Sequence, residues 1–312
     1  MIIKVKLSIL TATYNRAKYL LKLYNSIKIN LDSEISIEWI IIDDGSSDET
    51  KEIIQNFIKE NKFEIKYVYQ ENQGKMAAIN KAVNIATGEF IVDCDSDDYF
   101  TIDSFKIIKE NVNKILNNNN YYGLVFLKKE ENGNISGKKF KTQNSTTMFD
   151  LYFKYDIQGE KVIVYNSEVR KKYQHKIEKN EKFVTEARMY HEMDEKYKLI
   201  PINEAIEQGG YRDDGYTKNI KNIFKENPYG YYMYFKELME KDMNGVVLKK
   251  RLYIIKHFIL FSYLTNSRFN GKFIKDKLNK ILYCILYLPG VIKSKRFLHD
   301  WKVITIQNLI IL

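Results

Sequence analysis

The sequence has little cysteine and no long apolar run, and each of these absences excludes some classes of protein. Its 312 residues include two cysteines, Cys94 and Cys284, which lie far apart and lack the spacing of a metal site. Free thiols in a reducing compartment are therefore expected. The N-terminal segment is interrupted by Lys4 and Lys6, and it has neither the apolar core nor the cleavage site of a signal peptide. These features predict a cytoplasmic protein.

Glycine-rich phosphate-binding motifs are also missing. No G-x-G-x-x-G follows the first predicted strand, which disfavours a dinucleotide-binding enzyme, and G-x-x-x-x-G-K-[S/T] does not occur. What the chain does have is 45% hydrophobic and 14% aromatic residues, enough for a sizeable core and too many for a disordered chain. The length suits one large domain with an appendage.

Positive charge is concentrated near the C-terminus. The net charge is +10, yet residues 241–312 contain 14 Lys and Arg against 3 Asp and Glu, a balance of +11. The other 240 residues hold 36 basic and 37 acidic residues and are close to neutral. Such a region suits nucleic acid, an anionic lipid surface or a phosphorylated acceptor, and charge by itself does not select one. No recognisable nucleic-acid-binding module accompanies it, so nucleic acid is the least favoured partner.

The first hundred residues alternate between strand-like and helix-like segments. The patterns predict strands at 4–13, 37–43, 65–70 and 89–94, separated by helices at 17–30, about 48–60 and 76–86. Apolar strands that alternate with helices predict a mixed, mainly parallel, Rossmann-like sheet covered on both faces.

The pattern is less regular after Asp98. We expect helices at 102–116 and about 183–196, strands at 121–129, 197–202 and 205–211, and a hairpin turn at 130–137. Residues 141–180 give no clear pattern, and the chain from 218 onward is predicted to be helical with a break at Pro228. The predicted organisation is thus an α/β domain over 1–217 followed by a helical region over 218–312.

Four polar clusters follow the four predicted strands of the N-terminal half. They are TATYNR (11–16), DDGSSD (43–48), ENQGKMAAIN (71–80) and DSDD (95–98). Each one alone suits an ordinary turn, helix entry or solvated loop. In an open α/β sheet, however, ligands bind beyond the carboxyl ends of the strands, so four clusters at successive strand ends predict a ligand site.

The acidic cluster indicates the chemistry of that ligand. Asp95, Asp97 and Asp98 follow an apolar strand, and carboxylates so close repel one another unless a cation or protons neutralise them. Hard oxygen ligands suit Mg²⁺ or Mn²⁺, and these ions bridge diphosphates. A nucleotide with a diphosphate leaving group is therefore the expected ligand. The adjacent Cys94 is interpreted as a buried strand residue.

The order of these motifs resembles the family-2 glycosyltransferases of the GT-A fold. The resemblance covers about residues 5–217 and is most specific in YNR, DDGSSD, N-x-G-x-x-x-A-x-N and D-x-D. It implies an inverting transferase that uses a nucleotide-sugar, commonly a UDP-sugar, with Mn²⁺ or Mg²⁺. It also implies that Asp97 and Asp95 bind the metal, and that the nucleotide-sugar contacts Thr11, Ala12, Tyr14, Arg16, Asp43, Asp44, Gly74, Lys75, Ala78, Asn80, Asp95 and Ser96.

The same resemblance implies a general base for the acceptor hydroxyl, an acidic residue at the start of a downstream helix. In KFVTEARMYHEM that position is Glu186, with His191 and Asp194 as rivals. The T-E form followed by YRDDGYT, 211–217, resembles the capsule and lipopolysaccharide branch of the family. The chain departs from the family in having Arg212-Asp213-Asp214 where many members carry R-x-H, so no histidine completes the metal site there.

Two apolar stretches in the tail, 252–264 and 281–292, are too short to span a membrane. Basic residues flank both, so they suit interfacial helices as well as a helical subdomain that packs on the core.

The expected function is sugar transfer to a saccharide or polyprenyl-linked acceptor in surface glycan synthesis, by a cytoplasmic enzyme on the inner face of the cell membrane. The alternatives are a nucleotidyltransferase, for which TATYNR is a poor phosphate loop, and a non-catalytic nucleotide-binding protein, which would not need Asp95, Asp97 and Glu186.

Overall fold

The structure is a computed structural model that describes residues 5–32, 34–116, 118–141, 145–178, 181–210, 220–267 and 274–299. The chain divides into two compact units. Unit 1 comprises Met1–Leu151, Ile157–His175 and Met189–Tyr211, and unit 2 comprises Tyr152–Asp156, Lys176–Arg188 and Arg212–Leu312. Two short internal segments therefore belong with the C-terminal helices, while the boundary predicted at 217 falls outside the described residues.

Unit 1 alternates strands and helices in its N-terminal half, as the sequence predicts. The elements are β1 (Val5–Thr13), α1 (Ala17–Ile29), β2 (Ile35–Asp43), α2 (Thr50–Glu60), β3 (Glu64–Tyr69), α3 (Lys75–Ile85), β4 (Phe90–Asp93), β5 (Tyr99–Phe100), α4 (Ser104–Val112) and β6 (Tyr121–Glu130). There follow, in chain order, a short π-helix (Asp150–Lys154), β7 (Lys161–Asn166), α5 (Ser167–Arg170), α6 (Ala187–Met193) and β8 (Lys198–Gly209). The π-helix and α6 each contain residues of both units.

All the strands form one sheet in the order β3-β2-β1-β4-β7-β6-β8-β5. β3, β2, β1 and β4 are parallel, and β6 is parallel to β8. β7 runs antiparallel to both neighbours, and β5 runs antiparallel to β8. The predicted mixed α/β sheet is confirmed.

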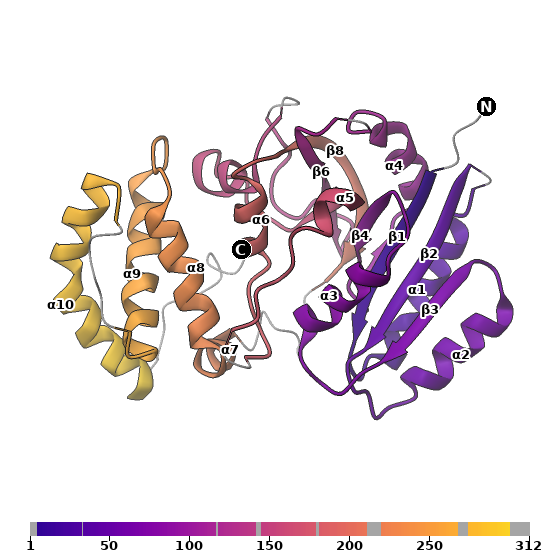
Figure 1. Ribbon diagram of the computed structural model, residues 1–312, viewed down its shortest axis with the longest axis horizontal. Helices are drawn as coiled ribbons and strands as arrows, with labels where there is room; N and C mark the ends of the chain where they lie inside the picture. Colours follow the sequence, from indigo (N-terminus) through magenta and orange to yellow (C-terminus); the bar gives the residue numbers. More distant parts are fainter. Residues whose placement is uncertain are drawn as a thin grey trace. The chain divides into compact units, whose positions relative to one another are not determined.

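Helices cover both faces of the parallel half (Figure 1). One face carries a core in which Leu20, Leu23 and Tyr24 of α1 pack with residues of α2, α4 and alternate positions of the strands. Trp39 of β2 and Phe57 of α2 lie in this core, and the Tyr24 and Phe57 rings stack at 4.1 Å. The opposite face of β1 and β2 is covered by α3. Burial on both faces explains why these strands read as nearly continuous apolar runs.

The buried carboxylate of Glu38 links β1, β2 and the segment before β4. Glu38 of β2 is fully buried and accepts hydrogen bonds from Ser8 of β1 and from the backbone N–H groups of Thr87 and Gly88 before β4. Lys66 Nζ lies 2.5 Å from its Oε2. Burial raises the pKa of Glu38, but the hydrogen bonds from Lys66, Ser8 and Thr87 outweigh it and bring the pKa down to about 2.

The sequence prediction differs from the structure beyond Asp98. The segment 141–180, which gave no clear pattern, contains β7, a strand in the middle of the sheet. The two strands predicted at 197–202 and 205–211 are one long strand, β8, whose register against β6 shifts near Leu127. The predicted hairpin turn is present, with a bridge between Lys129 and Ile135. The helix predicted at 183–196 is the shorter α6.

Unit 2 is mainly helical, with α7 (Ile220–Glu226), α8 (Pro228–Glu240), α9 (Leu248–Leu264) and α10 (Lys277–His299). Pro228 is the first residue of α8, which confirms the predicted break. α9 lies between α8 and α10 (Figure 1) and buries Ile254, Phe258 and Phe261. No helix in the described part of the chain is long and apolar enough to cross a membrane.

Candidate active site

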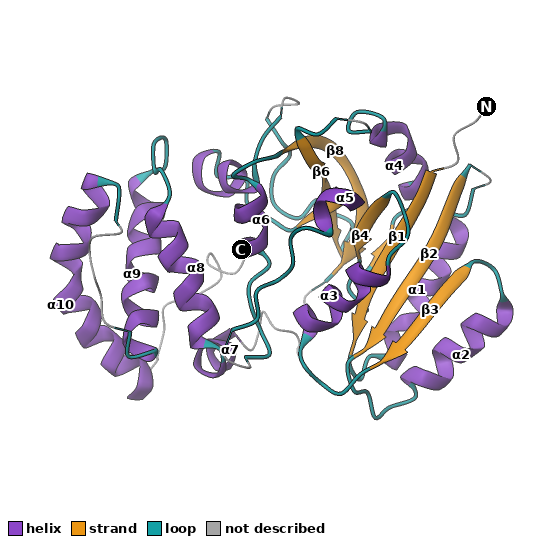
Figure 2. Ribbon diagram, viewed as in Figure 1, coloured by secondary structure: helices purple, strands orange, loops and turns teal. Residues whose placement is uncertain are grey.

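The carboxyl ends of β1, β2, β3 and β4 lie at one edge of the sheet (Figure 2) because these strands are parallel. The four polar clusters of the sequence therefore meet at that edge, as predicted. Backbone hydrogen bonds join the strand ends: Asp44 N donates to Thr13 O, and Gln70 N donates to Asp43 O.

Asp44 organises the loop between β3 and α3. Its side chain is only 3% exposed, and it accepts hydrogen bonds from Gln70 Nε2 at 2.7 Å and from the backbone N–H groups of Gln73 and Gly74. Gly74 has φ +95°, a conformation that L side chains rarely adopt, and it leads directly into α3. The glycine that the sequence placed beside the donor thus shapes the entry of this helix.

Asn15 joins the first loop to the second, and Asp43 holds the second loop to β3. Asp43 is buried and accepts from Ser46 N and from the Tyr67 hydroxyl. Asn15, at φ +52°, accepts from Ser47 N through its side chain and donates its backbone N–H to Ser46 Oγ. Both carboxylates, which are predicted to contact the nucleotide-sugar, therefore have structural partners. Both carboxylates are almost completely buried.

The predicted residues of the first loop differ in exposure. Thr11 is fully buried, where its hydroxyl donates to Cys94 O and accepts from Trp39 Nε1, so it acts within the core. Tyr14 is half exposed, while Ala12 and Arg16 are partly exposed. Of the predicted residues of this loop, Tyr14 is thus the most accessible to solvent.

Asp95 and Asp97 lie in different electrostatic surroundings. Lys75 Nζ, at the start of α3, lies 2.7 Å from Asp95 Oδ1 and 2.9 Å from its Oδ2. Burial and the Asp95 charge raise the pKa of Asp97, and Arg16 and Lys75 oppose that rise. Ser96 between the two aspartates is buried.

The third acid of DSDD, Asp98, has a structural partner that the sequence did not predict. Lys128 of β6 lies 2.6 Å from both Asp98 Oδ2 and Glu160 Oε2. Asp98 packs against Gly209 of β8 so closely that a side chain there would clash. Nearby Glu207 is buried, and burial together with the Asp98 charge raises its pKa. This cluster fixes the end of the acidic loop to β6 and β8, through contacts no local motif could reveal.

Ala78 and Asn80, predicted to border the donor, lie on α3. Ala78 is fully buried. Asn80 makes a reciprocal pair with His175, accepting from its backbone N–H and donating to its C=O, both at 2.9 Å. Asn80 therefore fixes the segment after α5 to α3.

Glu186 lies directly before α6, at the helix start where the sequence placed the general base, and is partly buried. Its segment, Lys176–Arg188, belongs to unit 2. His191 is buried and packs edge-on against Phe149 at 5.6 Å. Asp194 accepts from the Tyr122 hydroxyl and from two backbone N–H groups. The segment 211–217, with Arg212-Asp213-Asp214, lies outside the described residues.

Two contacts attach the Glu186 segment to the C-terminal helices within unit 2. Arg188 is buried and binds Glu237 of α8 through Nε and Nη2, at 2.9 and 2.8 Å, while its Nη1 binds Glu178. The carboxylate of Glu181 accepts from the first backbone N–H groups of α8, those of Tyr229 and Gly230. The position of Glu186 thus depends on α8.

Asp95 and Asp97 fit the divalent cation expected from the sequence. A cation there would relieve the repulsion that raises the pKa of Asp97, and carboxylate oxygens are the ligands that Mg²⁺ and Mn²⁺ prefer. Within the described ranges, no group of three or more His, Cys, Asp or Glu side chains is arranged to hold a metal. Two protein carboxylates suit an ion that takes its other ligands from a diphosphate and water.

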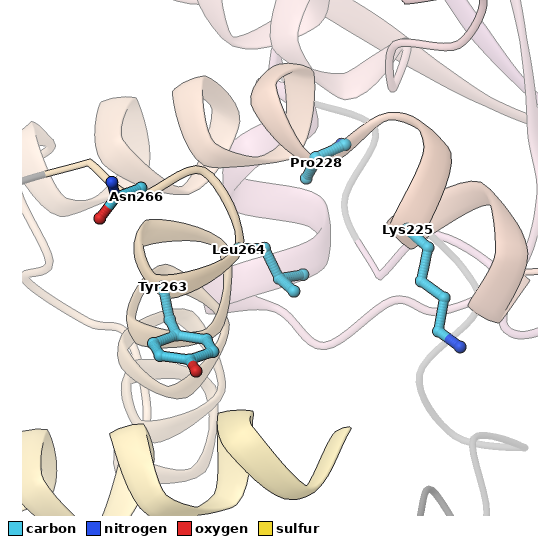
Figure 3. Close-up of a pocket in the computed structure, with 5 residues that line it drawn as sticks. All are labelled: Lys225, Pro228, Tyr263, Leu264 and Asn266. Carbon is cyan, nitrogen blue, oxygen red and sulfur yellow. The ribbon is translucent and has the colours of Figure 1, made fainter. Parts of the chain in front are cut away.

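A hollow of about 440 Å³ lies in unit 2, lined by Lys225, Pro228, Tyr263, Leu264 and Asn266 (Figure 3). None of these residues is among those that the sequence predicts to bind the donor or to act in catalysis.

The chain belongs to glycosyl transferase family 2. Residues 8–174, more than half of the chain and all four strand-end loops, match the family model described as "Glycosyl transferase family 2". The family expected from the motifs is confirmed.

Relatives similar in sequence are named as glycosyltransferases. An uncharacterized glycosyltransferase, MG060, of Mycoplasma genitalium is 35% identical over 35% of this chain and 38% of its own length. The putative glycosyltransferase EpsH of Bacillus subtilis is 38% identical over 31% of this chain and 27% of its own. The matches thus span well under half of the relatives' lengths.

Solved structures of similar fold include the TarS protein of Staphylococcus aureus, residues 1–349 with UDP-GlcNAc, at TM-score 0.56 and 18% identity over 93% of this chain and 89% of that one. A mannosyltransferase of Pyrobaculum calidifontis with GDP-Man and Mn²⁺ has TM-score 0.55 and 12% identity over 95% of this chain and 88% of that one. At these identities the likeness shows the fold, which is of the GT-A type.

Proposed function

We propose that this protein is an inverting glycosyltransferase that takes its sugar from a UDP-sugar. The observation that carries the proposal is the meeting of four polar loops at the carboxyl ends of β1–β4, with Asp95 and Asp97 at the last of them. TarS, a structure of similar fold, is complexed with UDP-GlcNAc, and the mannosyltransferase is complexed with GDP-Man and Mn²⁺.

The donor half of the site supplies recognition and charge. Tyr14 is exposed to stack on the base, and Asp43 and Asp44 would accept a hydrogen bond from a base N–H. Asp97 and Asp95 would hold Mn²⁺ or Mg²⁺, which when bound neutralises the charge of the leaving diphosphate. Arg16 and Lys75 place two further cations at the same loops.

The proposed transfer is a single displacement. Glu186 removes the proton of the acceptor hydroxyl, whose oxygen forms the new bond to the anomeric carbon. The bond from that carbon to the diphosphate oxygen breaks, the nucleoside diphosphate leaves with the electron pair, and the configuration inverts.

The proposed acceptor is a saccharide or a polyprenyl-linked saccharide of a surface glycan such as a capsule or lipopolysaccharide. The T-E form at Glu186 supports this class. TarS, a relative matched over 33% of this chain, is named a poly(ribitol-phosphate) beta-N-acetylglucosaminyltransferase.

The test is a panel of UDP- and GDP-sugars incubated with purified protein and Mn²⁺, with release of the nucleoside diphosphate as the readout. Hydrolysis or transfer of one donor, lost in excess EDTA, is expected. A nucleotidyltransferase would instead release pyrophosphate from a nucleoside triphosphate and a sugar phosphate. A non-catalytic protein would bind UDP and release nothing.

A further inference from the structure

The last described helix, α10, carries an apolar stripe that no described residue covers. Five aliphatic side chains are between 45% and 72% exposed, and they recur at intervals of three and four residues: Leu278, Ile281, Ile285, Leu288 and Ile292. At about 100° per residue, this spacing places all five within an arc of about 80°.

The opposite side of α10 packs within unit 2. Asn279, Tyr283 and Ser294 are buried, and the Tyr283 ring lies 5.9 Å from that of Phe258 on α9. A side chain at Gly290 would press against Ile259 of α9, so the glycine lets the two helices approach closely. Since the helix already has a packed face, the stripe is not needed to hold it in place.

The charge beside the stripe has one sign. Lys277, Lys280 and Lys293 are exposed on α10, and the helix contains no Asp or Glu. The preceding Asp276 is engaged by Arg251 at 2.8 Å. Apolar side chains flanked by lysines complement an acyl and headgroup boundary that contains anionic lipid.

We propose that α10 is an interfacial helix, which inserts Leu278, Ile281, Ile285, Leu288 and Ile292 into the surface of an anionic membrane. The neighbouring α9 buries its apolar residues against α8 and α10, so of the two apolar stretches in the tail only the second faces outward. The inference does not depend on the transferase activity.

Exposed Cys284 lies beside the stripe, whereas Cys94 is buried, so one thiol can be labelled selectively. With an environment-sensitive fluorophore on Cys284 of the full chain, vesicles containing phosphatidylglycerol should produce a blue shift and quenching by lipids labelled in the acyl chain. Vesicles of phosphatidylcholine alone should produce neither. High salt should weaken the binding only in part, because apolar burial is not screened.

Sedimentation with the same vesicles separates the two contributions. Ile285→Gln/Leu288→Gln should reduce binding at least tenfold, whereas Ile29→Gln/Ile102→Gln, at 71% and 74% exposed sites of unit 1, should not. Replacing Lys277, Lys280 and Lys293 by Gln should weaken binding by up to about a hundredfold at low salt. The same charge change at the exposed Lys51, Lys59 and Lys114 should have little effect.

Three results would overturn the proposal. In one, the full chain stays in the supernatant with anionic vesicles. In the second, light scattering shows a dimer that Ile285→Gln/Leu288→Gln converts to a monomer, which makes a second copy the occupant. In the third, the Cys284 fluorophore is blue-shifted before vesicles are added and the shift is lost on deletion of 300–312, which makes that segment the occupant. Because none of these readouts involves sugar transfer, they are independent of the proposed function.

Discussion

The two aspartates of the acidic loop differ because of their neighbours. Asp95 has the ammonium group of Lys75 beside both oxygens, whereas burial and the Asp95 charge raise the pKa of Asp97. Burial and the Asp95 charge both disfavour the ionised form of Asp97. A bound cation should therefore stabilise Asp97 more than it stabilises Asp95.

Asp97→Asn should abolish the dependence of UDP binding on Mn²⁺, because the amide removes a charged ligand and keeps the shape. We expect at least a tenfold loss of affinity with Mn²⁺ and little change in EDTA, measured by calorimetry. Asp103→Asn is the matched control, since Asp103 is exposed and its φ of +65° suits asparagine. Equal Mn²⁺ dependence in wild type and Asp97→Asn would contradict the metal assignment.

Glu186→Gln should remove transfer and preserve donor binding, because the amide has the size of the acid without its basicity. The turnover number should fall by about 10²–10⁴, while UDP affinity in Mn²⁺ stays within about twofold. The control is Glu204→Gln at an exposed position of β8. Wild-type turnover would place the base elsewhere, and buried His191 would be the next residue to replace.

At the scale of elements, the buried Glu38 links β1, β2 and the loop before β4. Its carboxylate holds Ser8, Lys66 and the N–H groups of Thr87 and Gly88, so it must be charged to accept them all. Gly88 permits this approach, because a side chain there would meet Ser8 Oγ at 2.5 Å.

This arrangement predicts an acid-dependent stability. The folded pKa of Glu38, about 2, is below its usual 4.5, so the contribution is complete well above pH 4.5 and is lost as the pH falls towards 2. In urea denaturation, Glu38→Gln should be less stable than wild type at pH 7, and the difference should shrink below pH 4.5. Glu64→Gln, at a half-exposed neighbour that also pairs with Lys66, should show a much smaller effect. If the difference in stability between Glu38→Gln and wild type does not change with pH, the charge of Glu38 does not stabilise the fold.

Local sequence patterns predicted the elements whose residues share one environment. They failed where contacts with residues distant in the sequence determine the structure. β1, β2 and β4 are almost completely buried, so each is a recognisable apolar run. β7 lies within a segment whose flanks carry no repeating pattern, and its place between β4 and β6 depends on pairing with residues 34–76 positions away. The same holds for the site: Asp95 and Asp97 were visible as a motif, whereas Lys128 and Glu160 gather around Asp98 only in the folded sheet.

At the scale of the whole molecule, the second unit takes its chain from three places. The segment with Glu186 is held by three residues. Glu181 bonds the first turn of α8, Arg188 bonds Glu237 in its last turn, and Phe183 bonds Asn227 before it. The helical region is therefore also a support for the proposed base.

Arg188→Lys should lower the turnover number at least fivefold and leave UDP affinity unchanged, because lysine keeps the charge but cannot make the two parallel bonds to Glu237. Lys236→Met on the same helix is the control. Steady-state kinetics with a fixed acceptor and calorimetry with UDP give the two readouts. If Arg188→Lys loses UDP binding together with turnover, its role is general stability and not the placement of Glu186.

The interleaved chain also fixes an order of events during synthesis. A ribosome adds residues from the N-terminus at about 5–20 per second, so the first four strands leave it well before α8 exists. Glu181 and Arg188 cannot form their hydrogen bonds until Tyr229, Gly230 and Glu237, about 50 residues further on, have been synthesised. A nascent chain that already contains the proposed donor loops therefore still lacks the bonds that hold the Glu186 segment, and these bonds form only as the last quarter of the chain emerges.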